Sequence, residues 1–557
     1  MPIQPTYPGV YIQEVSSGVH TITGVATSIT AFIGRAERGP VDKPVIIYNF
    51  GDFQRIFGGL WNLSPMSFAV QDFFSNGGSQ AVIVRLFHPS PGSPPGDGRA
   101  VIRIPTGYAD PDDEIQLIAA NPGAWGSNLT VTIDYNTKEK KNLPSGGATL
   151  FNLTVKELDE NKKSKTIEQF LNVTTDAGKA GYLPRVLEQI SNLVRVNTDS
   201  NNKYIVPTSP VKLPLEVTDE TPLSPPSSPS MIPSAISVPG DDGIHLTSSD
   251  VRGDQSKKQG LYMLEKTDLF NILCIPPFLS TGDESERPID IDPSVIPDAV
   301  GYCQKRRAIM IIDSISSWHQ ISDASGNFSD SVYPPSLKVE IRSNAALFFP
   351  RIKRPNILVN NEIEEFVPCG MIAGTFANTD TQRGVWKAPA GITAGLNGVT
   401  EFTVPMTDDE NGKLNRIGIN CLRSFPVYGN VIWGARTMDG ADELASDWKY
   451  IPVRRTALFI EESLYRGTKW VVFEPNDEPL WSQIRLNIGA FMHDLFRKGA
   501  FQGKTPKEAY LVKCDSETTT QNDINSGIVN ILVGFAPLKP AEFVIIQIQQ
   551  LAGQIDT

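Results

Sequence analysis

The sequence predicts a multidomain protein of mixed α+β and α/β class, with a β-rich insertion and a β-prone segment near each end. Residues 20–98 and 251–369 alternate short apolar strands with helices, which is typical of an α/β layer. Residues 99–250, between these parts, show strand patterns instead of this alternation. A chain of 557 residues is long enough for about three or four domains.

The first α/β part shows its elements clearly. Short apolar runs predict strands at Thr30–Gly34, Val45–Tyr48 and Ala81–Leu86. Helices are expected at Asp52–Phe57 and at Ser67–Ser75, the second closed by Asn76-Gly77-Gly78. A change to Pro, Ser and Gly between His88 and Gly98 marks the boundary with the insertion.

The insertion, residues 99–250, is expected to be a surface domain. Leu129–Ile133 has strand alternation, and a helix is expected at about Pro184–Leu193. Residues 207–239 hold nine prolines among 33 residues, so we expect an exposed loop without a sheet ladder. The α/β pattern then resumes, and one α/β domain split by the insertion is the simplest account.

In the second α/β part, strands are expected at Leu269–Ile275, Ala308–Asp313 and Ala345–Phe349, and a helix at Val295–Lys305. The region 370–541 forms a further predicted domain with helices at Arg454–Arg466 and Asp477–Lys498. In the longer helix the apolar residues follow the 3.6-residue period, at Trp481, Ile484, Ile488, Phe491 and Leu495. Strands are expected here at Trp470–Phe473, Ala509–Lys513 and Ile528–Phe535.

The two terminal segments, 1–19 and 542–557, are expected to be arms. The N-terminal arm carries the β-prone run Val10, Tyr11, Ile12, Gln13, Glu14 and Val15. The C-terminal arm carries Phe543, Val544, Ile545, Ile546, Gln547, Ile548 and Gln549, within a strand expected at Glu542–Gln549. Each run either closes a sheet of its own chain or adds a strand to another chain, and the pattern favours neither.

Composition limits the possible functions. The net charge is −12, which argues against a nucleic-acid binder that works through its overall field. No stretch approaches the length of a transmembrane helix, and the N-terminus lacks the features of a signal peptide, so we expect folding in a cytoplasm. Five widely spaced cysteines are expected to be reduced and mostly buried.

The sequence predicts no catalytic, cofactor-binding or metal site. None of the five histidines lies in an H-x-x-x-H pattern, and neither a G-x-S-x-G elbow nor a P-loop occurs. The adjacent Glu461 and Glu462 are interpreted as a solvated face or as partners of Arg454 and Arg455.

Two alternatives from other classes remain. An α/β enzyme would have to gather residues such as His319, Asp313 and Cys303 in one pocket. A secreted adhesin would have to display the tripeptide Arg252-Gly253-Asp254, and the expected absence of a signal peptide weighs against it.

Several short stretches together resemble contractile tail sheath proteins of phages and of phage-tail-like injection systems. They are, in order, Tyr7–Glu14, Gly24–Gly34, Phe73–Gly78, Ala81–Leu86, Asn415–Asn420, Val431–Thr437, Tyr450–Arg455 and Phe473–Asn476. The resemblance covers residues 7–87 and about 370–550 and leaves out the insertion, which fits a family whose outer domains vary. Each stretch alone is a weak signal, and their combined order is specific.

The resemblance implies a structural protein with an α/β sheath core and no enzymatic activity. Sheath subunits stack as helical rings around an inner tube in an extended, metastable state, and they contract to drive the tube outward. Both terminal arms would exchange strands with neighbouring subunits, region 370–541 would face the tube, and the insertion would face solvent. The implied partners are further copies of the chain, an inner tube protein, and baseplate and terminal cap proteins, without direct contact to nucleic acid or insertion into a membrane.

We further expect that Arg416, Lys469 and Lys498 contact an acidic tube or neighbour. Because type VI secretion sheaths are built from two different chains and this chain carries both terminal signatures, that system is disfavoured. A phage-tail-like injection system, released or membrane-anchored, is preferred over a phage tail sheath, which stays the alternative.

Overall fold

A computed structural model of the chain describes residues 20–91, 97–105, 114–138, 150–159, 161–207, 235–280, 282–283 and 285–547. Its centre is an eight-stranded sheet in the order β18-β17-β13-β12-β11-β1-β3-β2. The strands are β1 (Thr30–Gly34), β2 (Val45–Ile47), β3 (Ala81–Arg85), β11 (Ile272–Cys274), β12 (Ile309–Asp313), β13 (Ala345–Phe349), β17 (Asn420–Phe425) and β18 (Gly429–Ile432).

The six inner strands of this sheet run parallel, and the two outer ones are antiparallel to their neighbours. Every residue of β1, β3, β11, β12 and β13 is buried. This explains why these strands are continuous apolar runs, because a parallel sheet is covered on both faces. Residues on both sides of the insertion build one sheet, as the split α/β pattern predicts.

Helices cover both faces of the sheet and form two cores. One core contains buried residues of α5 (Ile296–Lys305), α6 (Ile321–Ser329), α7 (Val339–Arg342) and α9 (Asp408–Ile417). The other contains residues of α1 (Phe50–Phe57), α2 (Pro65–Ser75) and α8 (Cys369–Arg383). A further antiparallel sheet joins β14 (Ile352–Asn356) with β15 (Glu362–Phe366) and β16 (Glu401–Phe402).

Local sequence signals explain where α1 and α2 begin and end. The Asn49 side chain accepts the Asp52 N–H at the start of α1, and Gly58 ends that helix at φ 97°, a conformation that suits glycine. The Ser64 side chain caps α2, whose first residue is Pro65.

The insertion is a separate pair of packed sheets around its own core. One sheet has the order β10-β4-β5-β9, with strands at Ala235–Val238, Val101–Pro105, Glu114–Ala119 and Val194–Val196. The other has the order β6-β7-β8, with strands at Leu129–Asp134, Phe151–Leu158 and Ser164–Val173, and α3 spans Leu183–Ile190.

Buried arginines join the insertion to the central sheet. The Arg38 guanidinium donates to both carboxylate oxygens of Glu157 on β7, each at 2.8 Å. Arg85, at the end of β3, is 1% exposed and donates to the carbonyls of Ala36, Gly39 and Pro122. These charge-assisted bonds fix the insertion against the loop that follows β1.

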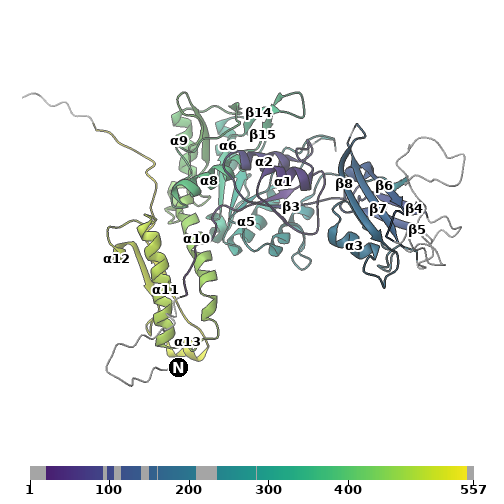
Figure 1. Cartoon of the computed structure of the whole chain (residues 1–557). Coiled ribbons are helices and arrows are strands. Elements are labelled where there is room, and N and C mark those ends of the chain that lie inside the picture. Colours follow the sequence, from purple (N-terminus) through teal and green to yellow (C-terminus); the bar gives the residue numbers. More distant parts are fainter. Residues whose placement is uncertain are drawn as a thin grey trace, which may run out of the picture.

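The C-terminal part extends away from the central sheet (Figure 1). It consists of α10 (Ile451–Gly467), α11 (Glu478–Arg497), α12 (Pro506–Ala509), α13 (Gln521–Asn525), and the paired strands β19 (Tyr510–Lys513) and β20 (Leu532–Phe535). The apolar face predicted for α11 is confirmed, since all five of its expected residues are buried in one cluster.

Three expectations about local structure are wrong or incomplete. Trp470–Phe473 is not a strand, because α10 is followed by a 3-10 turn at Lys469–Val471 and Phe473 stands fully exposed. The loop expected at 207–239 contains strand β10, which is a proline-free run at the edge of its sheet. Residues 541–547 lie in no strand of this chain, although a strand is expected at Glu542–Gln549.

The central sheet also continues past residue 370, because β17 and β18 belong to it. The predicted division between the split α/β domain and region 370–541 therefore crosses one continuous sheet. The domain boundaries stay predictions.

Candidate assembly site

The two-stranded sheet β19–β20 has one packed face and one open face. Tyr510, Val512, Val533 and Phe535 pack on the cluster around α11. On the other face Leu511 is 52% and Leu532 is 53% exposed. Among the described residues each of the two strands pairs only with the other, so both outer edges present free backbone groups.

The segment that follows this sheet is apolar and exposed. Phe543, Val544, Ile545 and Ile546 are 74–85% exposed. The possibility that this run closes a sheet of its own chain is not realised in the residues up to Gln547. Ile548 and Gln549 lie outside the described residues. Among the described residues this β-prone run pairs with no strand, and the same chain offers strand edges that no strand covers, as strand addition between copies needs.

The N-terminal run Val10–Val15 lies outside the described residues, which begin at His20. The His20 ring stacks on Trp470, with 4.2 Å between the ring centroids, and Ile22 is buried in the cluster around α11. The Val25 N–H donates to the Ser463 hydroxyl of α10 at 3.2 Å. The first described residues are thus fixed to the C-terminal part before the chain enters β1.

The three expected cationic contacts are all exposed but lie in different surroundings. Arg416 is on α9. The Lys469 ammonium lies 5.3 Å from the centroid of the Tyr465 ring. Lys498, at the end of α11, pairs with Asp494 at 2.7 Å.

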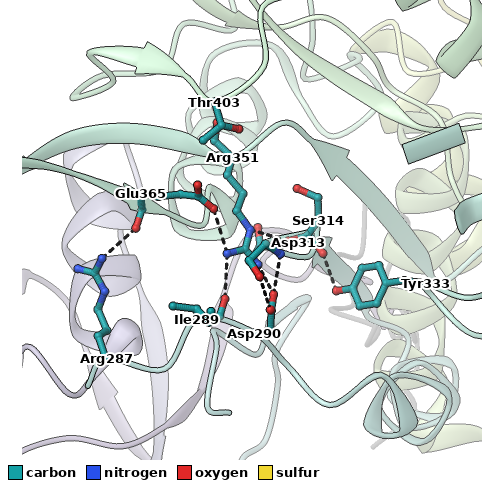
Figure 2. A network of polar contacts seen from close by, with 10 residues as sticks. Arg287, Ile289, Asp290, Asp313, Ser314, Tyr333, Arg351, Glu365 and Thr403 are labelled. Carbon is teal, nitrogen blue, oxygen red and sulfur yellow. Dashed lines mark hydrogen bonds and ion pairs between the residues drawn. The ribbon is translucent and has the colours of Figure 1, made fainter. Parts of the chain in front are cut away.

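The carboxyl edge of the parallel sheet, where α/β enzymes bind ligands, is occupied by an arginine (Figure 2). The Arg351 side chain is 6% exposed and donates to the backbone carbonyls of Ser314 and Ile289 at 2.7 and 2.9 Å. It also pairs with Asp290 at 2.6 Å and with Glu365 at 3.3 Å. These contacts satisfy the guanidinium within the protein, and they give it a structural role.

The residues considered for an enzyme pocket have separate surroundings. Burial strongly raises the pKa of the Cys303 thiol, against the charge of Arg306, so the thiol stays neutral. Burial raises the pKa of Asp313 to about 6, against hydrogen bonds from Cys369 and the charge of Arg351. His319 lines a hollow of about 480 Å³ beside Arg351. This arrangement contains none of the nucleophile–base contacts that such a pocket requires.

The remaining candidates form internal contacts. Arg454 pairs with Glu461 at 3.1 Å, whereas Glu462 pairs with Arg307 and Arg466 at 2.9 and 2.7 Å. Arg252, of the Arg-Gly-Asp tripeptide, pairs with Asp298 at 2.8 Å.

Among the described residues no helix is long and apolar enough to cross a bilayer.

The exposure of Phe473 is not predictable from the sequence. Phe473 is 103% exposed and has φ 73°, a left-handed conformation that bulky residues rarely adopt. Val472 beside it is 62% exposed. The apolar run Trp470–Phe473 reads as a strand, and only the fold reveals that its end forms an exposed tip.

The fold is that of contractile sheath proteins. The PVC sheath complex of an extracellular contractile injection system, in its contracted state, matches over 99% of each chain, with TM-score 0.54 and 19% identity. The contracted helical sheath of the anti-feeding prophage matches over 98% of this chain and 99% of the other, with TM-score 0.51 and 19% identity. A sheath tail protein of Listeria innocua matches over 93% of this chain and 96% of the other, with TM-score 0.55 and 12% identity.

Sequence comparison agrees with the fold. Residues 443–550 match the phage tail sheath C-terminal domain. The tail sheath protein of Vibrio phage KVP40 is 29% identical over 188 residues, a match that spans 33% of this chain but only 26% of that relative. The chain therefore has the fold of contractile sheath proteins and matches a tail sheath domain at its C-terminal end, which confirms the resemblance seen in the sequence.

Proposed function

We propose that the chain is the sheath subunit of a contractile, tail-like injection machine. It polymerises as stacked helical rings around an inner tube in an extended, metastable state, and it contracts to drive the tube through a target envelope. The family and the fold are those of structural sheath proteins. The internal hydrogen bonds and ion pairs of Arg351, at the carboxyl edge of the central sheet, also support a structural role over an enzymatic one.

One observation carries this proposal: among the described residues, the exposed apolar run Phe543–Ile546 pairs with no strand, and no further strand covers either edge of β19–β20. The arms of one copy, Val10–Val15 and Phe543–Gln549, add as strands to the two-stranded sheet of neighbouring copies. Each backbone hydrogen bond gained in this way contributes about 0.5–1.5 kcal/mol. Such links hold the lattice together while the bodies of the subunits move.

The further partners are an inner tube protein, a baseplate and a terminal cap. The solved structures of similar fold include chains in two baseplate structures of the anti-feeding prophage, which supports this class of partner. Exposed Arg416, Lys469 and Lys498 are the proposed contacts to the tube or to a neighbour. Contraction draws on the difference in contacts between two packings of the subunits, and it needs no nucleotide hydrolysis.

An injection system is favoured by the solved sheaths, which match over nearly the whole chain. A phage tail is favoured by the tail sheath protein of the Vibrio phage. In either case the subunit assembles in the cytoplasm of the producing cell. Neighbouring genes distinguish the two: capsid and terminase genes indicate a phage, whereas an AAA ATPase gene without capsid genes indicates an injection system.

Negative-stain electron microscopy of the chain expressed alone tests the proposal. We expect long hollow tubes with the cogwheel cross-section of a contracted sheath. If the chain stays monomeric, co-expression with the neighbouring tube gene is the second condition. A chain that remains monomeric under both conditions contradicts the proposal.

A further inference from the structure

The C-terminal segment crosses the surface of the protein between two fixed points. At the first, the Gln502 N–H donates to the Ala536 carbonyl at 2.9 Å, and Pro537 bridges to Phe501. The chain then runs along a groove of about 780 Å³ that Trp386 and Trp433 help to line. The second fixed point is Glu542, immediately before the exposed apolar run.

Glu542 is held by three hydrogen bonds. Arg436 donates from Nε to Oε1 at 2.9 Å and from Nη2 to Oε2 at 2.6 Å. The Tyr450 hydroxyl donates to Oε2 at 3.2 Å. The Glu542 side chain is 15% exposed, whereas the next residue, Phe543, is 74% exposed. The change from held to free chain therefore occurs within one residue.

The residue that holds Glu542 is itself fixed to the central sheet. The Arg436 side chain is 0% exposed, and its Nη1 donates to the Asn415 carbonyl at 2.7 Å and to Asp442 at 2.9 Å. The Arg436 N–H donates to the Asn420 side chain, whose amide donates to the Leu347 carbonyl of β13. Hydrogen bonds through Arg436 and Asn420 thus connect Glu542 to the eight-stranded sheet.

Electrostatics makes the contact strong. Burial would lower the pKa of Arg436, but Glu542 and Asp442 outweigh it and raise the pKa, so the guanidinium stays charged. Two parallel bonds between a guanidinium and a carboxylate are stronger and better directed than neutral hydrogen bonds. Loss of Glu542 would leave the buried Arg436 with Asp442 as its remaining acidic partner.

We propose that Arg436 and Tyr450 clamp Glu542 and thereby fix the point at which the C-terminal arm leaves the subunit. The clamp directs the arm toward a second copy of the chain, and it transfers tension from the added strand to the central sheet instead of to β20. Glu542 is a positioning residue in this account, which rests on the proposed function.

The first test measures the position of the arm in the unassembled full-length chain. Spin labels are placed at Val544→Cys and at exposed Asp409→Cys on α9, and the five native cysteines are buried. We expect one narrow distance distribution, its loss in Glu542→Gln, and its retention in the control Glu443→Gln, at an exposed residue of the 3-10 turn Asp442–Leu444. A distribution that stays narrow in Glu542→Gln overturns the clamp.

If Glu542→Gln lowers the melting temperature, general destabilisation could also broaden the distance distribution. The variant Tyr450→Phe is then measured, because it removes only a single hydrogen bond to Glu542. A broadened distribution in Tyr450→Phe supports the clamp, and an unchanged one overturns the role of Tyr450 in it. The second test compares tube formation by the chain without labels. We expect fewer and shorter tubes for Glu542→Gln, and tubes of normal length and number overturn the role in tension. Failure of the unaltered chain to assemble would count against the proposed function alone, since the distance measurement needs no assembly.

Discussion

Arg455 donates to both carboxylate oxygens of Asp380, at 2.9 and 2.6 Å, and this pair joins α10 to α8. The two side chains are 3% and 4% exposed. Arg455 also donates to the Thr27 carbonyl at 2.9 Å, and the Thr27 hydroxyl donates to Asp380 at 2.6 Å. The N-terminal segment, the central sheet layer and the C-terminal part therefore meet at one buried ion pair.

Asp380→Ala is expected to lower the free energy of unfolding by about 3–5 kcal/mol, because it leaves Arg455 buried and unpaired. Chemical denaturation of the unassembled chain measures this change. The control is Asp408→Ala, which removes a carboxylate that is 90% exposed and pairs with Arg423. Its expected cost is below about 1 kcal/mol. Equal effects of the two substitutions would contradict the structural role of the Arg455–Asp380 pair.

Asp313 is expected to make stability depend on pH. Burial raises its pKa from 3.8 to about 6, and one of its carboxylate oxygens has no hydrogen-bond partner. Between pH 3.8 and about 6 the Asp313 carboxyl is ionised in the unfolded chain but still protonated in the folded one. The contribution of Asp313 to the free energy of unfolding therefore falls as the pH rises through this range. The loss amounts to about 3 kcal/mol above pH 6.

Asp313→Asn should remove this part of the pH dependence. Denaturation midpoints of the variant and the unaltered chain, compared at pH 4 and pH 8, measure the effect. We expect the variant to gain stability relative to the unaltered chain as the pH rises. A difference that is constant across this range would show that Asp313 does not titrate as described.

The exposed tip at Phe473 is expected to cost stability. Its φ of 73° is unfavourable for phenylalanine, whereas asparagine adopts this conformation more readily. Phe473→Asn should therefore raise the free energy of unfolding by about 1 kcal/mol. Val472→Asn, at a neighbouring exposed residue without this conformation, is the control and should bring no gain. Lower stability of Phe473→Asn would contradict the assigned strain.

The cationic residues are expected to act in assembly on the tube. Arg416→Glu, Lys469→Glu and Lys498→Glu, made singly, leave the fold unchanged because all three side chains are exposed. At least one reversal should block assembly around the tube. Lys413→Glu, on the same helix as Arg416 and also exposed, is the control. Pull-down of co-expressed tube protein measures the effect, and normal assembly of all three variants would contradict these contacts.

The sequence predicts the central sheet well because its parallel strands are buried on both faces. Runs such as Thr30–Gly34, Ala308–Asp313 and Ala345–Phe349 admit few other interpretations. The structure of short apolar runs near turns is harder to predict. Trp470–Phe473 has the composition of a strand, but it lies at the 3-10 turn that follows α10. A local pattern does not reveal whether a tertiary contact or a partner covers such a run.

The assembly site is predictable only in part, for a related reason. The β-prone run at Phe543–Ile546 is visible in the sequence, and its exposure is visible only in the fold. In the clamp, Glu542 is bound by Arg436, which lies 106 positions before it in the sequence, and by Tyr450, which lies 92 positions before it. No spacing rule connects residues so far apart. Contacts of such long range depend on the topology of the chain.

Addition of the C-terminal strand to a neighbouring copy is the central claim, and intermolecular disulfide formation tests it most directly. Two singly substituted chains are mixed during assembly, one with Ile545→Cys and the other with Leu511→Cys on β19 or Leu532→Cys on β20. A cross-linked dimer is expected with at least one of the two strands, and deletion of residues 543–557 should abolish tube formation. Tube formation by the chain that lacks residues 543–557 would contradict the claim. Assembled tubes in which Ile545→Cys forms a disulfide with neither Leu511→Cys nor Leu532→Cys would contradict it as well.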